Sequence, residues 1–183
     1  MRQHDALIVI DLQKDYYPGG AMELKGIEAA HRVAMRLVRS VVDAGKPVFF
    51  IRHIAPGGAP FFAEGSAGSE LHPDLPLEAG EVIVKHHPNS FRDTPLQKRL
   101  EALGARRLAV CGAMSHMCID TTVRAGYDLG YAITLAHDAC ATKDLEFGGK
   151  RLPAAEVHAA FMAALNGKFA TVCDAGSLDA SEV

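Results

Sequence analysis

The residues Ala6-Leu7-Ile8-Val9-Ile10 form a short apolar run that ends at an acid, Asp11. A second run, Val48-Phe49-Phe50-Ile51, is continuous rather than alternating, which is typical of a strand buried on both faces. Between the two runs, residues 26–44 carry apolar side chains at spacings of three and four and charged side chains elsewhere, which predicts an amphipathic helix ended by Gly45. This alternation of buried strand and helix indicates βαβ units and a parallel sheet.

The same alternation continues along the rest of the chain. Further strands are predicted at residues 81–85, 107–112, 131–135 and 169–172, and helices at 94–103, 115–129 and 153–165. Thr94 is expected to cap the first of these helices. Right-handed crossovers place helices on both faces of such a sheet. The sequence therefore predicts an α/β fold, a three-layer αβα, Rossmann-like domain with a six-stranded, mostly parallel sheet and a site at the carboxyl ends of its strands.

Length and charge narrow the class of protein. A chain of 183 residues fits one domain, spanning 1–183, and needs neither disulfides nor a structural metal to hold its core. A net charge of −3 provides no basic field for nucleic acid. No apolar run approaches the ~20 residues that cross a bilayer, and Met1 to Asp5 lead into no signal-peptide core. We expect a cytoplasmic protein with no membrane or nucleic-acid partner.

Residues that end or directly follow the first, third and fourth strands should meet at one edge of the sheet. They are Asp11, Lys85 and the segment 112–118, which ends in Cys118. An acid, an ammonium and a thiol at one crevice form an activated cysteine nucleophile, because a cation favours the thiolate. Cys118 also falls in the first turn of a predicted helix, where backbone N–H groups favour an anion. We therefore expect a lowered thiol pKa at Cys118 and structural roles for the other three cysteines.

Three ordered motifs resemble those of the isochorismatase-like cysteine hydrolases, a family that includes nicotinamidases and N-carbamoylsarcosine amidase. They are residues 9–16 (VIDLQKDY), 84–91 (VKHHPNSF) and 110–122 (VCGAMSHMCIDTT). The resemblance spans nearly the whole chain. It implies an isochorismatase-like fold and a hydrolase with a small-molecule substrate.

The resemblance also implies a role for each motif residue. Cys118 attacks a carbonyl-type carbon, Asp11 takes the thiol proton and returns it to the leaving amine, and Lys85 orients Asp11. A cis peptide bond between Ala113 and Met114 directs the N–H groups of Met114 and Cys118 at the developing oxyanion. The expected reaction is hydrolysis of a C–N bond in a small amide, carbamoyl, ureido or lactam substrate through a thioester.

Metal binding is not expected. Nicotinamidases carry an Asp-x-His metal site just after the second strand, whereas this chain has Ile51-Arg52-His53-Ile54. His53 and His72 remain as imidazole ligands, but two histidines without a nearby carboxylate make a poor divalent site. The sequence therefore predicts no metal and no cofactor, and it disfavours a nicotinamidase.

Several side chains near the three motifs are candidates for the substrate pocket: Tyr16, His53, Phe62, His87, Phe91 and His116. For His87 the alternative is a capping or surface group, and for Phe91 a place in the core. Residues 55–80, rich in Pro, Gly, Ala and Ser, suit a binding loop or lid. Adjacent Phe61 and Phe62 would wall the pocket, anchor this loop or meet a second subunit, and the resemblance implies a dimer or tetramer.

Two other functions stay open at this point. Isochorismatase itself cleaves a vinyl ether without requiring the thiol, so this reaction would survive loss of Cys118. A non-catalytic ligand-binding or redox-sensing module would use Cys118 as an oxidisable thiol.

Overall fold

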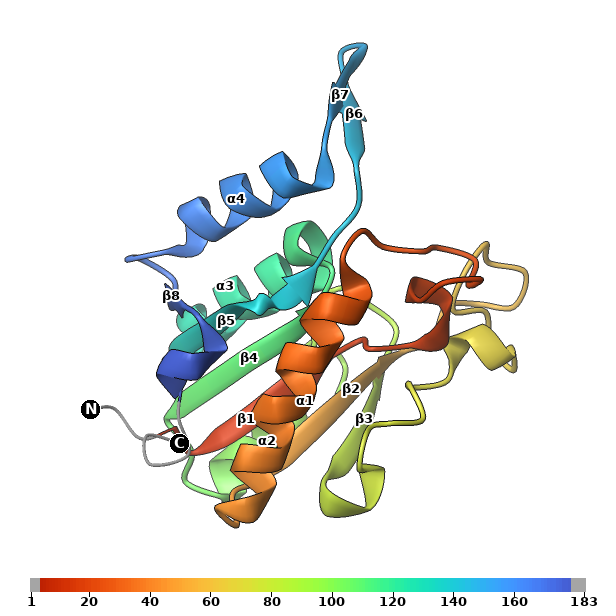
Figure 1. The fold of residues 1–183 in the computed structure, drawn as a ribbon. Coiled ribbons are helices and arrows are strands. Elements are labelled where there is room, and N and C mark those ends of the chain that lie inside the picture. The colour runs from red at the N-terminus through yellow and green to blue at the C-terminus, as the bar shows by residue number, and fades with distance from the viewer. Residues whose placement is uncertain (1–3, 179–183) are drawn as a thin grey trace.

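A six-stranded sheet forms the centre of the molecule, which a computed structural model describes over residues 4–178 (Figure 1). Met1 to Gln3, part of the stretch that predicts no signal peptide, lie outside the described residues. The strands lie in the order β3-β2-β1-β4-β5-β8, and every pairing in this sheet is parallel. Their bounds are β1 Ala6–Ile10, β2 Val48–His53, β3 Glu81–Lys85, β4 Arg107–Ala113, β5 Ala132–Ala141 and β8 Thr171–Cys173.

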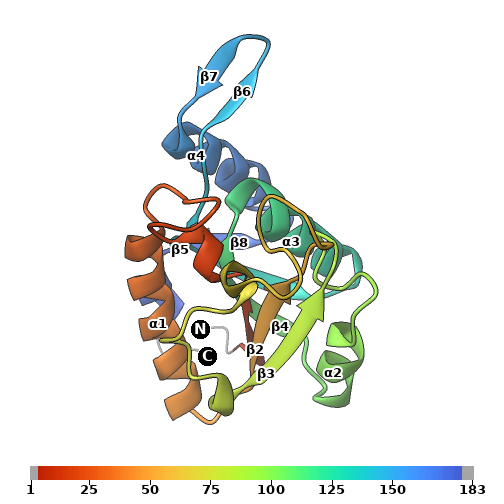
Figure 2. The same ribbon diagram turned by 90° about the vertical axis from the view of Figure 1, so that its right-hand side faces the viewer.

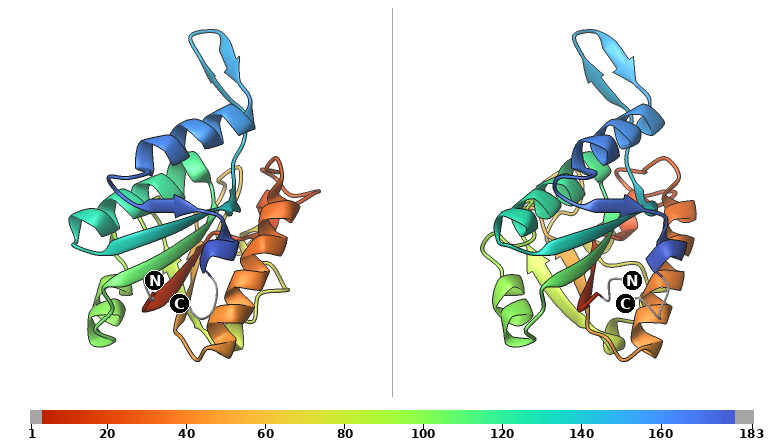
Figure 3. Two further views of the ribbon diagram at one scale, coloured as in Figure 1. Left: turned by 60° about the vertical axis from the view of Figure 1, so that its left-hand side comes forward. Right: turned by 90° about the vertical axis from the view of Figure 1, so that its left-hand side faces the viewer.

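Helices cover both faces of the sheet. They are α1 Ile27–Asp43, α2 Leu96–Ala102, α3 Asp120–Asp128 and α4 Ala154–Leu165. Figure 2 shows α1 on one side of the strands and α2 and α3 on the other, and Figure 3 shows α4 beside α3, next to β5 and β8. The predicted three-layer αβα architecture is confirmed.

The alternation of side chains along the strands divides the core between these layers. In β1, Leu7 and Val9 pack with the apolar face of α1, whereas Ile8 and Ile10 pack with residues of α2, α3 and α4. All five residues of β1 are buried, as expected of a central parallel strand. Each buried aliphatic side chain of this kind contributes about 1.5–3 kcal/mol relative to an exposed one.

The side chains of the edge strand β3 also alternate between the two faces of the sheet, but here only one face is buried. Ile83 and Lys85 are buried, while Val82 and Val84 are exposed at 40 % and 43 %. Ile83 belongs to the core shared with α2 and α3. The pleat therefore directs the ammonium of Lys85 into the molecule on the side of α3.

Four details differ from the sequence prediction. Strand β5 runs to Ala141 rather than ending at 135, with a bulge opposite Val110–Gly112, and β8 begins at Thr171 rather than 169. The helix predicted at 115–129 consists of a π-helical turn, Ser115–Ile119, and α3. An unpredicted hairpin, β6 Leu145–Phe147 and β7 Lys150–Leu152, projects from the body (Figure 1).

The start of α2 also differs, and the long loop is largely irregular. Pro95, not Thr94, is the N-cap of α2, although Thr94 Oγ1 accepts a hydrogen bond from the N–H of Leu96 at 3.3 Å. Residues 55–80 contain two single 3₁₀ turns, Ala67–Ser69 and Leu77–Ala79, and otherwise no regular structure. Within residues 4–178, no helix combines the length and the apolar character that a membrane crossing requires.

The close pairing of β1 and β4 predicts a sensitive position at Gly112. Its φ is 122°, and a Cβ atom there would lie 2.0 Å from the carbonyl oxygen of Ile10. We expect Gly112→Ala to lower the free energy of unfolding by about 3 kcal/mol or more, as buried strain does, measured by urea denaturation. Gly176→Ala, where a Cβ atom meets nothing within 4 Å, should change it by less than ~0.5 kcal/mol. Equal effects of the two substitutions would show that β1 and β4 can separate to admit a side chain at Gly112.

Candidate active site

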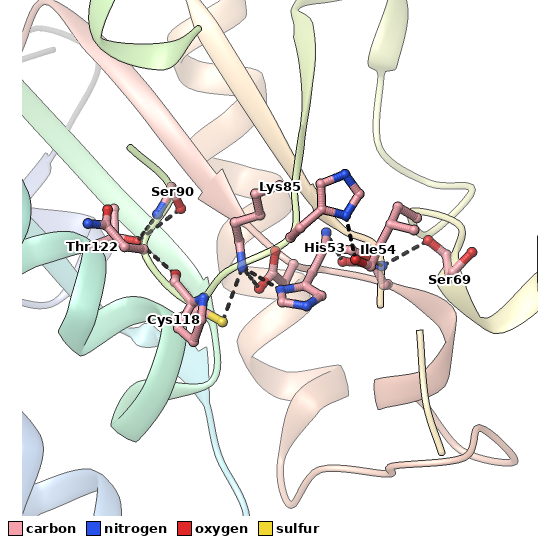
Figure 4. A network of polar contacts seen from close by, with 12 residues as sticks. His53, Ile54, Ser69, Lys85, Ser90, Cys118 and Thr122 are labelled. Atoms are coloured by element: carbon pink, nitrogen blue, oxygen red, sulfur yellow. Dashed lines mark hydrogen bonds and ion pairs between the residues drawn. The ribbon is translucent and has the colours of Figure 1, made fainter. Parts of the chain in front are cut away.

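Three side chains from separate strand ends meet at the carboxyl edge of the sheet. Lys85 Nζ lies 2.8 Å from Asp11 Oδ2 and donates a hydrogen bond to Cys118 Sγ at 3.2 Å. Figure 4 shows the ammonium of Lys85 between the sulfur of Cys118 and the ring of His53. The structure thus brings together the acid, the ammonium and the thiol that the sequence predicts at one crevice.

The backbone directs Asp11 into this cluster. Asp11 follows β1 with φ at 52°, a left-handed conformation that is uncommon outside glycine. Its N–H donates to the carbonyl of Ile51 on β2, which continues the sheet by one residue. The carboxylate is fully buried, and among the described residues no backbone N–H donates to it. Its Oδ2 is instead held by the Lys85 ammonium.

Lys85 is the charged centre of the cluster. Its side chain has no exposed surface, and burial by itself lowers an ammonium pKa. The adjacent Asp11 and Cys118 outweigh burial, so the pKa of Lys85 is raised and the side chain stays cationic. A buried ion pair of this kind depends on both members, since either charge alone would be left without compensation.

The thiol of Cys118 differs from the sequence prediction. Cys118 is only 4 % exposed, and burial, followed by the charge of Asp11, raises the pKa of its thiol, while Lys85 only partly opposes this. The expectation of a lowered pKa is wrong because the thiol is buried and because Asp11 offsets the ammonium that was to favour the thiolate. At rest the sulfur carries its proton, so it needs a base before it can attack.

The position of Cys118 relative to Lys85 depends on a contact that the sequence did not reveal. The hydroxyl of Thr122, one helical turn after Cys118, accepts from the Ser90 N–H at 3.0 Å and hydrogen-bonds its hydroxyl at 2.9 Å (Figure 4). Both side chains are buried. This contact joins the segment after Lys85 to the helix after Cys118. The sequence hinted at this contact only in that Ser90 lies in the motif at residues 84–91 and Thr122 in the motif at residues 110–122.

His53 lies on the other side of the ammonium. It is the cross-strand partner of Lys85 in the β2–β3 register, and its Nδ1 lies 3.0 Å from Lys85 Nζ. Burial, followed by the charge of Lys85, lowers the pKa of His53 to about 4. The ring is therefore neutral near pH 7 and can accept a hydrogen bond from Lys85.

Gln13 fixes this end of β2, a role that the sequence did not reveal. Its side-chain amide donates to the carbonyls of His53 and Ser69 and accepts from the N–H of His53, all within 2.7–2.8 Å. The side chain is fully buried. Gln13 thus joins the strand end at His53 to the 67–69 turn of the long loop.

Aromatic side chains form a wall next to the ammonium. The rings of Tyr16 and Phe62 lie 4.6 Å apart, and Phe62 lies 6.0 Å from His53. Asp15 positions this wall, since its carboxylate accepts from the N–H of Phe62 at 2.6 Å. This contact gives Asp15 a structural role at the site. Phe61 packs against both other rings.

Three other candidate pocket residues have different surroundings. His87 lies 3.4 Å from Asp93 as a surface pair, and Phe91 stacks on Tyr131, at the amino end of β5. Phe91 thus lies toward the amino end of β5 rather than beside the three motif residues, whereas His87 stays near enough to His53 for its charge to act on the pKa of that ring. His116 lies in the turn that bears Cys118, and its Nδ1 is bound to Thr142 Oγ1 at 2.6 Å.

The turn before Cys118 has an unusual backbone. The peptide bond between Ala113 and Met114 is cis, and both residues are buried. The carbonyl of Met114 accepts from the N–H groups of Met117 and Ile119, which closes the π-helical turn around Cys118. Met114 and Cys118 are therefore held in one short turn.

The donors at this site do not fit a metal ion. Asp11, His53 and Cys118 each offer a ligand atom within 4.8 Å of the others, but the Lys85 ammonium contacts all three side chains. A divalent cation there would meet a fixed positive charge. His72, the second imidazole that the sequence offers, lies in a different cluster with His31 and Asp74.

A broad hollow on the surface lies elsewhere. It has a volume of about 510 Å³ and includes Tyr127, Tyr131 and Phe169 in its lining. Tyr131 and its neighbours stand at the amino end of β5, so this hollow lies at the edge of the sheet opposite the three motif residues. None of those three residues lines it.

Comparisons with known proteins agree with the predicted fold and family. The family model described as "Isochorismatase domain" matches residues 5–177. The uncharacterized isochorismatase family protein YddQ of Bacillus subtilis is 49 % identical over 91 % of this chain and 94 % of its own. A streptothricin hydrolase of Streptomyces noursei is 35 % identical over 76 % of this chain and 50 % of its own. The crystal structure of an isochorismatase from Pseudomonas putida superposes with a TM-score of 0.89 at 38 % identity, covering 97 % of this chain and 91 % of that one.

The buried ion pair predicts a compensating pair of substitutions. Lys85→Met leaves Asp11 buried and charged without a partner, so the free energy of unfolding should fall by about 3–5 kcal/mol. Asp11→Asn combined with Lys85→Met removes both charges and should recover most of this loss. Urea denaturation at pH 7 measures both values. A double variant as unstable as Lys85→Met alone would contradict the conclusion that Asp11 and Lys85 compensate each other's charge.

The pKa of His53 predicts a pH dependence of stability. Between the ordinary pKa near 6.5 and the folded pKa of about 4, the unfolded chain binds a proton that the folded chain does not. Stability is therefore lost as the pH falls through this window, by at most about 1.4 kcal/mol per pH unit for this group, and by less because the ring is partly exposed. His53→Gln should lose stability less steeply from pH 6.5 to 4 in parallel urea titrations. Identical slopes in the two proteins would show that His53 does not contribute to the pH dependence of stability.

Proposed function

The chain belongs to the isochorismatase family of hydrolases, and from this premise we propose that it is a cysteine hydrolase that cleaves a C–N bond without a metal ion. The substrate class is a small amide, carbamoyl, ureido or lactam compound. The observation that carries the proposal is the buried Lys85 ammonium, 2.8 Å from the Asp11 carboxylate and 3.2 Å from the Cys118 sulfur.

The first half-reaction begins with proton transfer from Cys118 to Asp11. Burial keeps the resting thiol protonated, so sulfur becomes nucleophilic only as Asp11 takes its proton. The C–S bond forms while the carbonyl oxygen takes the negative charge. The tetrahedral intermediate then collapses, the C–N bond breaks, and Asp11 returns its proton to the leaving nitrogen. The products are a thioester on Cys118 and a free amine or ammonia, or, for a lactam, a thioester that keeps the amine on its own acyl chain.

The second half-reaction uses the same base. Asp11 takes a proton from water, and the oxygen of that water attacks the thioester carbon. The C–S bond breaks, the acid or carbamate product leaves, and the proton returns from Asp11 to sulfur. Lys85 remains an ammonium throughout and offsets the negative charge as it moves between carboxylate and sulfur.

The oxyanion is assigned to the turn that contains Cys118. We place the backbone N–H groups of Met114 and Cys118 at the developing negative charge. This assignment is supported by the short turn that holds both residues. One donor of this kind lowers the barrier by about 2.7–4 kcal/mol.

The aromatic wall restricts the substrate. Tyr16 and Phe62 are almost fully buried next to the site, and the long loop that carries Phe62 is attached through Asp15 and Gln13. Such a site suits a small, partly apolar molecule whose carbonyl group reaches Cys118. The similarity to a streptothricin hydrolase supports hydrolysis and leaves the substrate itself to be identified.

The redox-sensing alternative is less well supported. Cys111, the neighbouring thiol that a sensor could use as a partner, packs against α1 on the opposite face of the sheet from Cys118. The Cys140 thiol donates to the carbonyl of Ala136 in its own strand. Burial raises the pKa of Cys118, which slows oxidation as well. The expected dimer or tetramer stays a prediction of the family resemblance.

The proposal predicts a covalent adduct on one cysteine. The protein is mixed briefly with a library of small amides, lactams and ureido compounds, quenched in acid, and its intact mass is measured beside ammonia or amine release. We expect a mass gain that maps to Cys118, and a loss of turnover of about 1,000-fold or more in Cys118→Ala.

A matched variant and two outcomes make the test decisive. Cys173→Ala removes a partly buried cysteine on β8 and should retain both the adduct and turnover. Turnover that persists in Cys118→Ala would contradict the thioester route and favour vinyl-ether cleavage, tested with isochorismate. Labelling of Cys118 without any product release across the library would favour a binding or sensing module.

A further inference from the structure

A second cluster of metal-type donors lies away from the proposed catalytic residues. His31 belongs to α1, whereas His72 and Asp74 belong to the loop between β2 and β3. Each offers one donor atom, and the three atoms lie within 4.8 Å of one another. Nothing in the proposed hydrolysis uses these side chains.

The distances suit a small cation. Asp74 Oδ2 lies 3.7 Å from His31 Nε2 and 3.7 Å from His72 Nδ1. Two donors bound at 2.0–2.1 Å to a tetrahedral ion lie about 3.4 Å apart, so each of the two distances to Asp74 needs to contract by only a few tenths of an ångström. The Asp74 side chain is 65 % exposed and can make that movement. Its exposure also provides the path by which an ion enters.

One donor is buried and lacks a hydrogen bond. His31 is 7 % exposed, and its Nε2 has no hydrogen-bond partner among residues 4–178. A buried polar atom in this state costs free energy unless something binds it. This atom faces the carboxylate of Asp74 and the ring of His72, whose centroid lies 4.4 Å from that of His31.

Tyr17 holds both rings in place. Its hydroxyl lies 2.6 Å from Nδ1 of His31, and its ring lies 4.3 Å from that of His72. Metal-binding histidines commonly hydrogen-bond through the nitrogen that does not face the metal, which fixes the ring and the tautomer. If Nδ1 of His31 carries the proton and donates to the Tyr17 oxygen, the lone pair of Nε2 points into the cluster.

We propose that His31, His72 and Asp74 bind one divalent transition-metal ion that joins α1 to the loop between β2 and β3. Two imidazoles and one carboxylate favour Zn²⁺, Co²⁺ or Ni²⁺ over Ca²⁺ and Mg²⁺, which prefer oxygen ligands. The bound ion replaces the weak hydrogen bond, 3.3 Å long, that His72 Nδ1 accepts from the N–H of Asp74. Water completes the coordination, and the ion serves to hold the loop rather than to take part in hydrolysis.

Two positively charged side chains near the three donors reduce their attraction for a metal ion, but neither side chain occupies the space between the donors. Lys14 is already paired with Glu70, and Arg32 is exposed on α1 beside His31. The binding therefore depends on the three donor atoms, so removal of any one of them should weaken it strongly.

Titration of the full-length, chelator-treated protein with Zn²⁺ tests this inference. We expect one Zn²⁺ per chain by calorimetry, a higher melting temperature on binding, and a Co²⁺ spectrum of a site with nitrogen and oxygen ligands. His72→Ala and Asp74→Asn should each weaken binding at least tenfold, as loss of a ligand does, and Tyr17→Phe should weaken it by a smaller factor. His72 and Asp74 are partly exposed, so these variants should fold.

Two controls locate the ion. His137→Ala removes an imidazole 3.2 Å from Asp174, a surface pair of the same chemistry, and should leave binding unchanged. Cys118→Ala should also leave it unchanged. Binding that survives His72→Ala and disappears in Cys118→Ala would place the ion at the catalytic cluster and overturn the proposal. The absence of binding to the unsubstituted chain would overturn it as well.

Discussion

The buried ion pair between Asp11 and Lys85 is the constraint on which the site depends. Two opposite charges with no exposed surface are stable only when each has the other within contact distance. The two residues end strands β1 and β3, which are separated in the sheet by β2. The ends of three adjacent strands must therefore stay in register. The pairing of His53 with Lys85, and the hydrogen bond from Asp11 to Ile51, maintain that register from β2.

The same constraint explains the state of the nucleophile. A lone ammonium beside a thiol would favour the thiolate, but here the carboxylate offsets the ammonium and burial favours the neutral thiol. Cys118 is therefore a weak nucleophile until Asp11 removes its proton. In the proposed reaction this transfer occurs only when a substrate carbonyl accepts the sulfur, so the thiol is protected from other electrophiles at rest.

The central strands and the cluster of Asp11, Lys85 and Cys118 can be predicted from local sequence, whereas other features of the structure cannot. Continuous apolar runs predict the central strands. Asp11, Lys85 and Cys118, which lie at or just beyond the carboxyl ends of strands, predict the cluster. The π-helical turn before α3, the extension of β5 to Ala141 and the path of Phe91 depend on contacts between segments far apart in the chain. Phe91 shows the reason: its neighbour Tyr131 belongs to a distant segment, and no local pattern links the two. The raised pKa of Cys118 likewise depends on burial, which spacing alone does not provide.

One short segment, residues 11–17, connects the fold, the chemistry and the loop. Alternate residues after β1 each have a partner in a different element. Asp11 pairs with Lys85, Gln13 binds the backbone at His53 and Ser69, Asp15 binds the backbone of Phe62, and Tyr17 binds His31 of α1. A shift of this segment would move the base, the aromatic wall and the second histidine cluster together. The shape of the pocket and the position of the base are therefore coupled through one piece of backbone. Residues 56–60, at the tip of the long loop, take no part in these contacts, so that tip can differ in shape without disturbing the ion pair.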